Sequence, residues 1–285
     1  MVDRKYYSRR KGLNPKIDRI DLDLLKELFY STYQSLFEEG YFQGAMGYYC
    51  VDAGEVHGTM GNDIRIYFFK KLRKPNLCPI QDKYKGYTED DLFDVIELLY
   101  DEVSKPIDGK YHSYSDCGWH YSKFDKKAGQ LRFYEEMNEF LKDYGDRYEL
   151  SLSGEILALG DQGLENLLKA ELPEYESKNV DSRINSAIHK FRRHSSSVDD
   201  KRDAVRSLAD VFEYLRPKLQ SIISSKDEAD LFNIANNFSV RHHNDKQKNE
   251  YDESIWLSWM FFFYLATIHT IIRKLKKSNV ALVTD

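Results

Sequence analysis

The densest group of residues able to do chemistry is Arg241-His242-His243-Asn244-Asp245, five adjacent polar side chains. Histidine exchanges protons near neutral pH, and arginine binds phosphate oxygens through two parallel hydrogen bonds. RNA is cut without metal when its 2′-hydroxyl is deprotonated and attacks the adjacent phosphate. The group therefore suits metal-independent RNA cleavage, with Arg241 on the phosphate and His242 or His243 exchanging the proton. The plainer alternative is that Arg241 pairs with Asp245 across a helix turn while the histidines cap or pack.

Further polar residues extend this site in two places. Asn244 and Lys246 follow the histidines, and Arg192 and Arg193 end a segment with helical apolar spacing that begins near Val180. We expect these four residues to bind RNA. The competing interpretation of a basic run such as Arg192-Arg193 is a solvated helix face.

A second group of chemically capable residues lies in the aromatic segment Asp108–Gly118 and just after it, which we expect to be a loop. His112, Cys117 and His120 offer a Cys-x-x-His pair with one upstream histidine, but no second pair follows at zinc-ligand spacing. Glycine-rich phosphate-binding motifs are absent. We therefore expect no metal and no cofactor, with a packed aromatic loop as the role of this segment and a zinc site as the alternative.

The element that positions the Arg-His group is the segment Ile255–Ile272, eighteen residues without a formal charge. As a helix it would be about 27 Å long, and a helix that is apolar on all sides is buried in protein or lipid. Four basic residues follow it, as they follow many membrane spans. His269 and hydroxyl side chains interrupt the run, and the mean hydropathy of the chain is −0.64. We expect a buried core helix and no membrane association.

Composition limits the class of protein. The chain has 285 residues, 41% hydrophobic and 31% charged, with a net charge of −5. Such a chain folds as a soluble protein of one large or two ordinary domains, and its charge argues against a basic coat over the whole surface. Three cysteines fit a reducing compartment, so we expect a cytoplasmic protein.

The periodicity predicts a mainly α protein. Helices are expected after Asp21 up to Gly40 and after Thr88, where Asp91 completes a capping-box pattern. A strand with its hairpin partner is expected over Tyr148–Ile156, and 63–69 reads as a strand or a short buried helix. Linker composition at Leu172–Lys178 divides an α-rich N-terminal domain with a small β-hairpin, 1–172, from a C-terminal helical bundle, 179–278.

Two regions of the chain, one in each half, carry a family resemblance. DAVRSLADVFEYL, then LFNIANNFSVRHHN, then a long aromatic helix, resembles the HEPN superfamily (higher eukaryotes and prokaryotes nucleotide-binding), and in particular the C-terminal domains of bacterial abortive-infection proteins. DLFDVIELLYDEVSKPIDGKYHSYSDCGWH, followed by LRFYEEMNEFLKDYGDRYELSLSGEI, is similar to the N-terminal domains attached to them. In the superfamily an arginine precedes a polar residue, with a histidine a few residues later, and Arg241-His242 matches the start of that pattern.

The resemblance implies an RNA-directed protein of a bacterial defence or abortive-infection system, a HEPN-like bundle at its C-terminus and a homodimer whose site forms where two bundles meet. It also implies an antitoxin or another defence-system protein as a candidate partner. The chain departs from the pattern, because Asp245, Lys246 and Gln247 stand where the later histidine is expected. Either His243 takes that role or the nuclease activity is altered or lost. The alternative function is a non-catalytic HEPN module that keeps the helical bundle without the chemistry and binds RNA, nucleotide or a partner protein.

Overall fold

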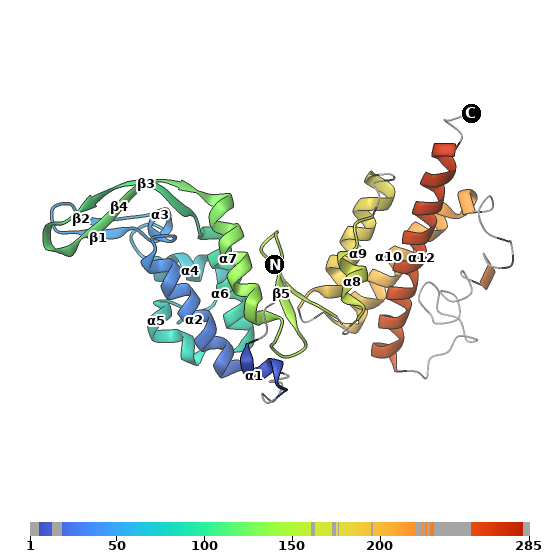
Figure 1. Cartoon of the computed structure of the whole chain (residues 1–285), viewed down its shortest axis with the longest axis horizontal. Coiled ribbons are helices and arrows are strands. Elements are labelled where there is room, and N and C mark those ends of the chain that lie inside the picture. Colours follow the sequence, from blue (N-terminus) through green and yellow to red (C-terminus); the bar gives the residue numbers. More distant parts are fainter. Residues whose placement is uncertain are drawn as a thin grey trace. The chain divides into compact units, whose positions relative to one another are not determined.

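A computed structural model describes residues 6–12, 19–160, 163–172, 175, 177–194, 196–219, 224, 226, 229–230 and 252–281. The contacts within the chain divide it into two compact units, Met1–Ile156 and Leu157–Asp285, and each is described by itself. Helices predominate and every sheet found among the described residues has two strands (Figure 1). The expectation of a mainly α protein is confirmed.

The first unit is built around three long helices, α2 (Leu22–Glu38), α6 (Glu89–Glu102) and α7 (Lys126–Leu141). Their apolar faces supply fully buried side chains such as Phe29, Ile96 and Phe133. Shorter helical segments connect them: α1 Tyr7–Arg10, α3 Gln43–Met46, α4 Ile64–Leu72, α5 Ile80–Lys83 and the 3₁₀ turns η1 Tyr84–Gly86 and η2 Tyr114–Asp116.

Local capping chemistry fixes where these helices begin and end. The Thr88 hydroxyl accepts a hydrogen bond from the Asp91 backbone N–H at 3.2 Å while the Asp91 carboxylate accepts one from the Thr88 N–H at 3.1 Å, so the predicted capping box is present. Gly40 follows α2 with φ +84°, the left-handed conformation that suits glycine at a helix end. At 63–69, where the sequence left strand and helix open, the Asp63 side chain caps α4.

The described residues also form three two-stranded hairpins, and the first two are antiparallel. β1 (Tyr48–Cys50) pairs with β2 (Gly54–Val56), β3 (Lys105–His112) with β4 (Gly118–Asp125), and β5 (Tyr148–Leu150) with β6 (Ile156–Ala158). The hairpin predicted over Tyr148–Ile156 is confirmed. The prediction of a loop over Asp108–Gly118 is wrong, because β3 continues to His112 and only 113–117 turn. The sequence of β3 lacks the period-two alternation of a half-buried strand. The segment becomes a strand because it pairs with β4.

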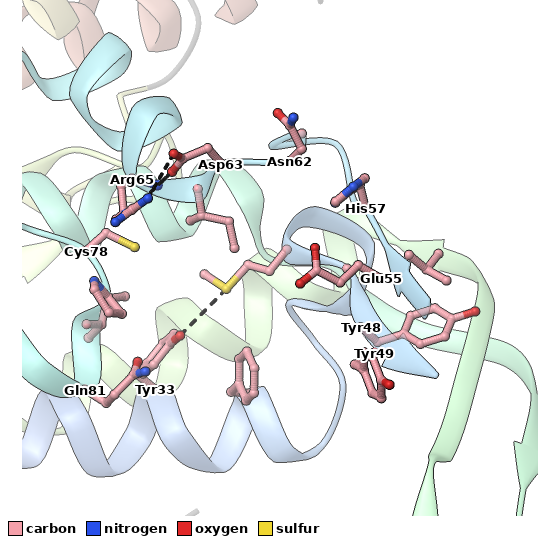
Figure 2. A pocket seen from close by; sticks show the side chains of 18 of the residues that line it. Tyr33, Tyr48, Tyr49, Glu55, His57, Asn62, Asp63, Arg65, Cys78 and Gln81 are labelled. Carbon is pink, nitrogen blue, oxygen red and sulfur yellow. Dashed lines mark hydrogen bonds and ion pairs between the residues drawn. The ribbon is translucent and has the colours of Figure 1, made fainter. Parts of the chain in front are cut away.

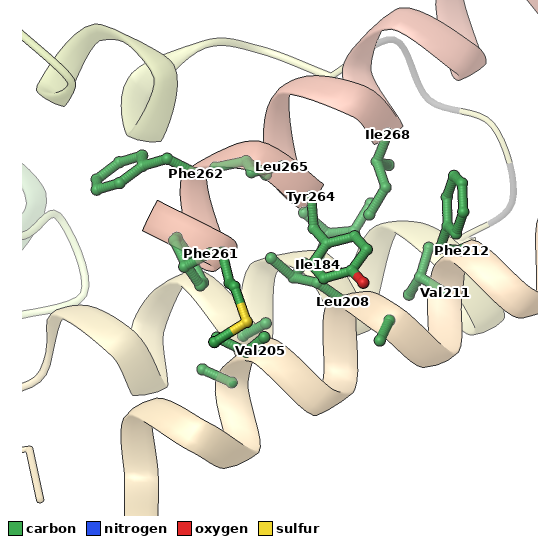
Figure 3. Packing of buried hydrophobic residues seen from close by; sticks show 14 of the residues in the cluster. Ile184, Val205, Leu208, Val211, Phe212, Phe261, Phe262, Tyr264, Leu265 and Ile268 are labelled. Atoms are coloured by element: carbon green, nitrogen blue, oxygen red, sulfur yellow. The ribbon is translucent and has the colours of Figure 1, made fainter. Parts of the chain in front are cut away.

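The second unit is helical, with α8 (Glu165–Lys169), a short π-helix η3 (Ser177–Asp181), α9 (Ser182–Arg192), α10 (Val198–Leu219) and α12 (Glu253–Ala281). Helix α10 packs against both α9 and α12. Figure 3 shows the apolar side chains of α12, among them Phe261 and Leu265, meeting those of α10, among them Val205 and Leu208. Phe261 also stacks on Phe191 of α9, with ring centroids 3.9 Å apart.

Helix α12 forms the centre of this packing. By length and composition, Ile255–Lys277 would suffice to cross a membrane, and 56% of its most apolar window is buried within the protein. The buried face runs through Met260, Phe261 and Leu265. This packing supports the expectation of a core helix. The sequence alone does not show which side of so apolar a helix is buried: Trp259 is 41% exposed, whereas Phe262 is 6% exposed.

The segment Leu172–Lys178, where we predict the domain boundary, falls within the second unit. Leu172 and Tyr175 pack against the same apolar cluster as α9, α10 and α12. The compact units divide earlier, within β6. The placement of a domain boundary at this segment stays a prediction.

Candidate functional site

The proposed catalytic residues Arg241, His242 and His243, together with Asn244 and Lys246, lie outside the described residues. Their roles stay predictions. The structure describes the chain again from Asp252, where the Asp252 carboxylate accepts a hydrogen bond from the Ile255 backbone N–H at 3.2 Å at the start of α12.

The two arginines predicted to bind RNA end α9 and have different surroundings. Arg192 is buried, and its Nε donates a hydrogen bond of 2.8 Å to the Ala158 carbonyl oxygen. Arg193 follows as the exposed C-cap residue, and its backbone N–H donates to the His189 carbonyl oxygen. Arg192 thus ties α9 to the start of the second unit, while Arg193 presents its side chain to solvent. RNA binding by either arginine stays a prediction.

The first unit contains a cleft of about 850 Å³ between α2, the β1–β2 hairpin and the segments around α4 and α5 (Figure 2). Its aromatic lining comes from α2 and β1: Tyr30, Tyr33, Phe37, Tyr48 and Tyr49. Small-molecule sites typically combine such apolar walls with a few polar groups. The volume falls in the range of ligand-binding clefts, so this is a candidate binding site that the sequence did not indicate.

The polar groups of the cleft fall into two sets. Asp63 and Arg65 are joined by a hydrogen bond of 3.3 Å, and this bond holds the pKa of the Asp63 carboxyl below its usual range. The side chains of the other set make no hydrogen bond or ion pair to any residue that the structure describes: Glu55, His57, Asn62 and Gln81. Figure 2 shows the Glu55 carboxylate pointing into the cleft. These side chains are free to bind a ligand.

The cleft also contains a cysteine, Cys78, whose thiol is a poor nucleophile. Burial, aided by the nearby Asp63 carboxylate and partly offset by Arg65, raises the pKa of this thiol to about 11. A cysteine acts as a nucleophile through its thiolate, and little thiolate exists at neutral pH with so high a pKa. The cleft therefore favours binding over thiol catalysis.

Away from the α2 wall, the structure brings together His112, Cys117 and His120, the three residues considered above as a zinc site. It adds Cys50, which the sequence analysis did not connect with them because 62 residues separate it from His112. One potential ligand atom from each of these four residues lies within 4.8 Å of the others. The sequence alone indicated only the Cys117-x-x-His120 pair. Cys50 comes close to this pair only through the tertiary fold.

Comparison with models of protein families, with curated proteins and with solved structures gives no match.

Proposed function

We propose that the protein acts on RNA through its second unit, as a HEPN-like helical bundle of a bacterial defence system. The observation that carries the proposal is the packing of α12 as a core helix against α10. The resemblance implies such a bundle, and in this chain the Arg-His group precedes its core helix by a short segment. A cytoplasmic homodimer, with RNA as substrate and an antitoxin-like protein as a candidate partner, completes the proposal.

The proposed chemistry uses one cation and one proton carrier. Arg241 binds two phosphate oxygens, where its planar guanidinium stabilises the charge that develops as the 2′-oxygen attacks. His242 or His243 takes the 2′-hydroxyl proton, and a protonated histidine, in the same or the second protomer, returns a proton to the leaving oxygen. Asn244 and Lys246 hold the adjacent nucleotide. The products are a cyclic phosphate and a free 5′-hydroxyl.

The test is RNA cleavage by the purified protein without added Mg²⁺ or Mn²⁺. Cleavage is expected to stop when the 2′-hydroxyl is removed from the substrate, since that oxygen is the proposed nucleophile. Arg241→Ala is expected to lower the rate about 10²–10³-fold, the cost of removing one group that stabilises transition-state charge. Arg241→Lys should rescue poorly, because a point charge does not reproduce the bidentate contact.

Arg183→Ala serves as the matched control, because Arg183 is an exposed arginine of α9 outside the predicted set. Its rate is expected to equal that of the unchanged protein. His242→Ala and His243→Ala separate the proton carrier, whose loss alters the pH–rate profile, from a packing histidine, whose loss lowers stability. RNA cleavage that is absent or indifferent to Arg241 would contradict the catalytic proposal.

A non-catalytic binding module is the second candidate, and the cleft of the first unit favours it. Exposed aromatic rings such as Tyr49, which is 65% exposed, offer a stacking surface for a base. The free amide groups of Asn62 and Gln81 offer a donor and an acceptor each. Binding of RNA or nucleotide that survives Arg241→Ala but weakens in Tyr49→Ala would support this candidate. Binding that weakens in Arg241→Ala but survives Tyr49→Ala would support the catalytic candidate.

A further inference from the structure

We propose that Cys50, His112, Cys117 and His120 bind one structural Zn²⁺ ion in the first unit. This site is independent of the RNA chemistry proposed above and goes beyond it. Two thiolates and two imidazoles are a common ligand set for tetrahedral zinc, and they match its preference for sulfur and nitrogen. The ligands come from the end of β1, the end of β3, the turn after it and β4.

The spacing of the four ligand atoms fits a single ion. Zinc lies about 2.3 Å from a thiolate sulfur and about 2.0–2.1 Å from an imidazole nitrogen, so sulfur and nitrogen in one tetrahedron are about 3.6 Å apart. Cys50 Sγ lies 3.7 Å from His112 Nδ1. All four ligand atoms lie within 4.8 Å of one another. Only small side-chain adjustments are needed to close the tetrahedron.

The surroundings of two ligands match those of known zinc ligands. His112 Nε2, the ring nitrogen facing away from Cys50, lies 3.3 Å from the Asp52 carboxylate. A carboxylate in this position fixes the tautomer and orientation of a ligating imidazole. The Val51 backbone N–H donates a hydrogen bond to Cys117 Sγ at 3.5 Å. The β1–β2 turn therefore supplies outer contacts to two ligands from the other hairpin.

His120 supplies an independent observation. Its Nε2 is buried and has no hydrogen-bond partner among the described residues. A buried polar atom without a partner carries a free-energy cost, and such atoms in a native structure often indicate an ion or a water. The Tyr48 ring stacks on the imidazole, with centroids 4.3 Å apart, and so holds its orientation. Zinc coordination would satisfy the buried nitrogen.

The two hairpins also need a source of stability. Among the residues of β1, β2, β3 and β4, Cys50 alone is buried. Isolated two-stranded hairpins are marginally stable in water, and small folds without a core use metals or disulfides to compensate. A zinc ion held by Cys50 from one hairpin and His112, Cys117 and His120 from the other would join the two.

Four protein ligands leave no open coordination position, so the proposed ion is structural and not catalytic. Its effect on the protein passes through the β1–β2 hairpin. Tyr48 and Tyr49 of β1 and Glu55 of β2 line the cleft, and Cys50 follows them directly in β1. Zinc binding would therefore fix one wall of the cleft as well as the tip of β3–β4.

The first experiment measures zinc bound by the full-length protein, purified in reducing buffer and supplied with Zn²⁺ alone. One ion per chain is expected, with release of protons as the two thiols become thiolates. Replacement by Co²⁺ is expected to give the intense visible bands of a tetrahedral ion and the near-ultraviolet bands of cobalt–thiolate bonds. A Co²⁺ spectrum without these bands, or no bound ion, would overturn the proposal.

Matched variants separate the ligands from their neighbours. Cys50→Ser and His120→Gln are expected to lose the bound ion, whereas Cys78→Ser and His57→Gln, which change a cysteine and a histidine of the same unit outside the cluster, keep it. Asp52→Asn is expected to weaken zinc binding about 10–100-fold, as loss of an outer partner does. Equal loss in the ligand and control variants would contradict the assignment.

Cysteine alkylation of the unchanged protein tests the site without any substitution, so misfolding of a variant cannot explain the result. Zinc is expected to protect Cys50 and Cys117 from alkylation while the labelling of Cys78 stays the same. The structure places all three as free cysteines. A disulfide between Cys50 and Cys117 in freshly purified, zinc-exposed protein, seen by mass spectrometry, would contradict the proposal, because it would remove both thiolate ligands.

Discussion

The hairpins of the first unit and the helices of the second are held together by different means. Helices α9, α10 and α12 enclose a continuous cluster of buried apolar side chains. The strands β1 to β4 bury Cys50 alone, and what their residues place at the meeting point of the hairpins is a group of two thiols and two imidazoles. The stability that scales with buried apolar area is therefore larger for the helices than for the β1–β2 and β3–β4 hairpins. Under the zinc proposal, these two hairpins gain stability from metal coordination as well.

The largest loss of stability is expected from a substitution in the apolar core of the second unit. Phe261 is fully buried and stacks on Phe191, so Phe261→Ala should lower the free energy of unfolding by about 3–5 kcal/mol. Thr270→Ala, an exposed change on the same helix, should stay within about 0.5 kcal/mol. Urea unfolding followed by tryptophan fluorescence measures both. Equal effects would show that this face of α12 is not a core.

A smaller effect is expected where the β3–β4 hairpin meets α7. A Cβ added at Gly129 would lie 2.5 Å from Ser104 Cα and 2.6 Å from the Lys105 backbone nitrogen, at the start of β3. Gly129→Ala should therefore cost about 1–3 kcal/mol of stability through overpacking. Gly86→Ala is the control, because a Cβ there meets no atom within 4 Å. Thermal unfolding of both variants tests the prediction, and a neutral Gly129→Ala would refute the close approach.

The helices of the first unit are expected to behave as ordinary capped helices. Thr88→Ala removes the hydroxyl half of the capping box and should cost about 1 kcal/mol, whereas Thr88→Ser should retain most of the stability. Chemical denaturation compares the two. Loss of equal size in Thr88→Ser would mean that the methyl group, and not the cap, matters at this position.

The smallest effect concerns pH and the core of the second unit. Burial lowers the pKa of His269, and the nearby Arg273 lowers it further. The folded state therefore favours the neutral imidazole, while the unfolded chain binds a proton near the ordinary pKa of about 6.5. The free energy of unfolding should fall as pH drops below that value and level off below the folded pKa. His269→Phe should flatten this dependence, measured by chemical unfolding at a series of pH values between 7.5 and 5. An unchanged slope would contradict the assignment.

The helices were predictable because their signals are local. Thr88 and Asp91 stand at capping-box spacing, and Gly40 stands where α2 must end. The strand β3 was not predictable from its own residues, since pairing with β4 creates it. Cys50 and His112 are far apart in sequence, so the spacing of Cys117 and His120 carried half of a ligand set and the fold supplies the rest. The site around Arg241 remains a prediction from sequence.

Hydrogen exchange, measured with zinc and after its removal, compares the β1–β4 hairpins with the helices of the second unit most directly. We predict that zinc slows exchange of backbone amides over 48–57 and 105–125, the two hairpins, and leaves 182–219 and 255–277 unchanged. Cys78→Ser should respond like the unchanged protein and Cys50→Ser should not respond. Hairpins that are equally protected without zinc, or a change of equal size in α10 and α12, would contradict the account.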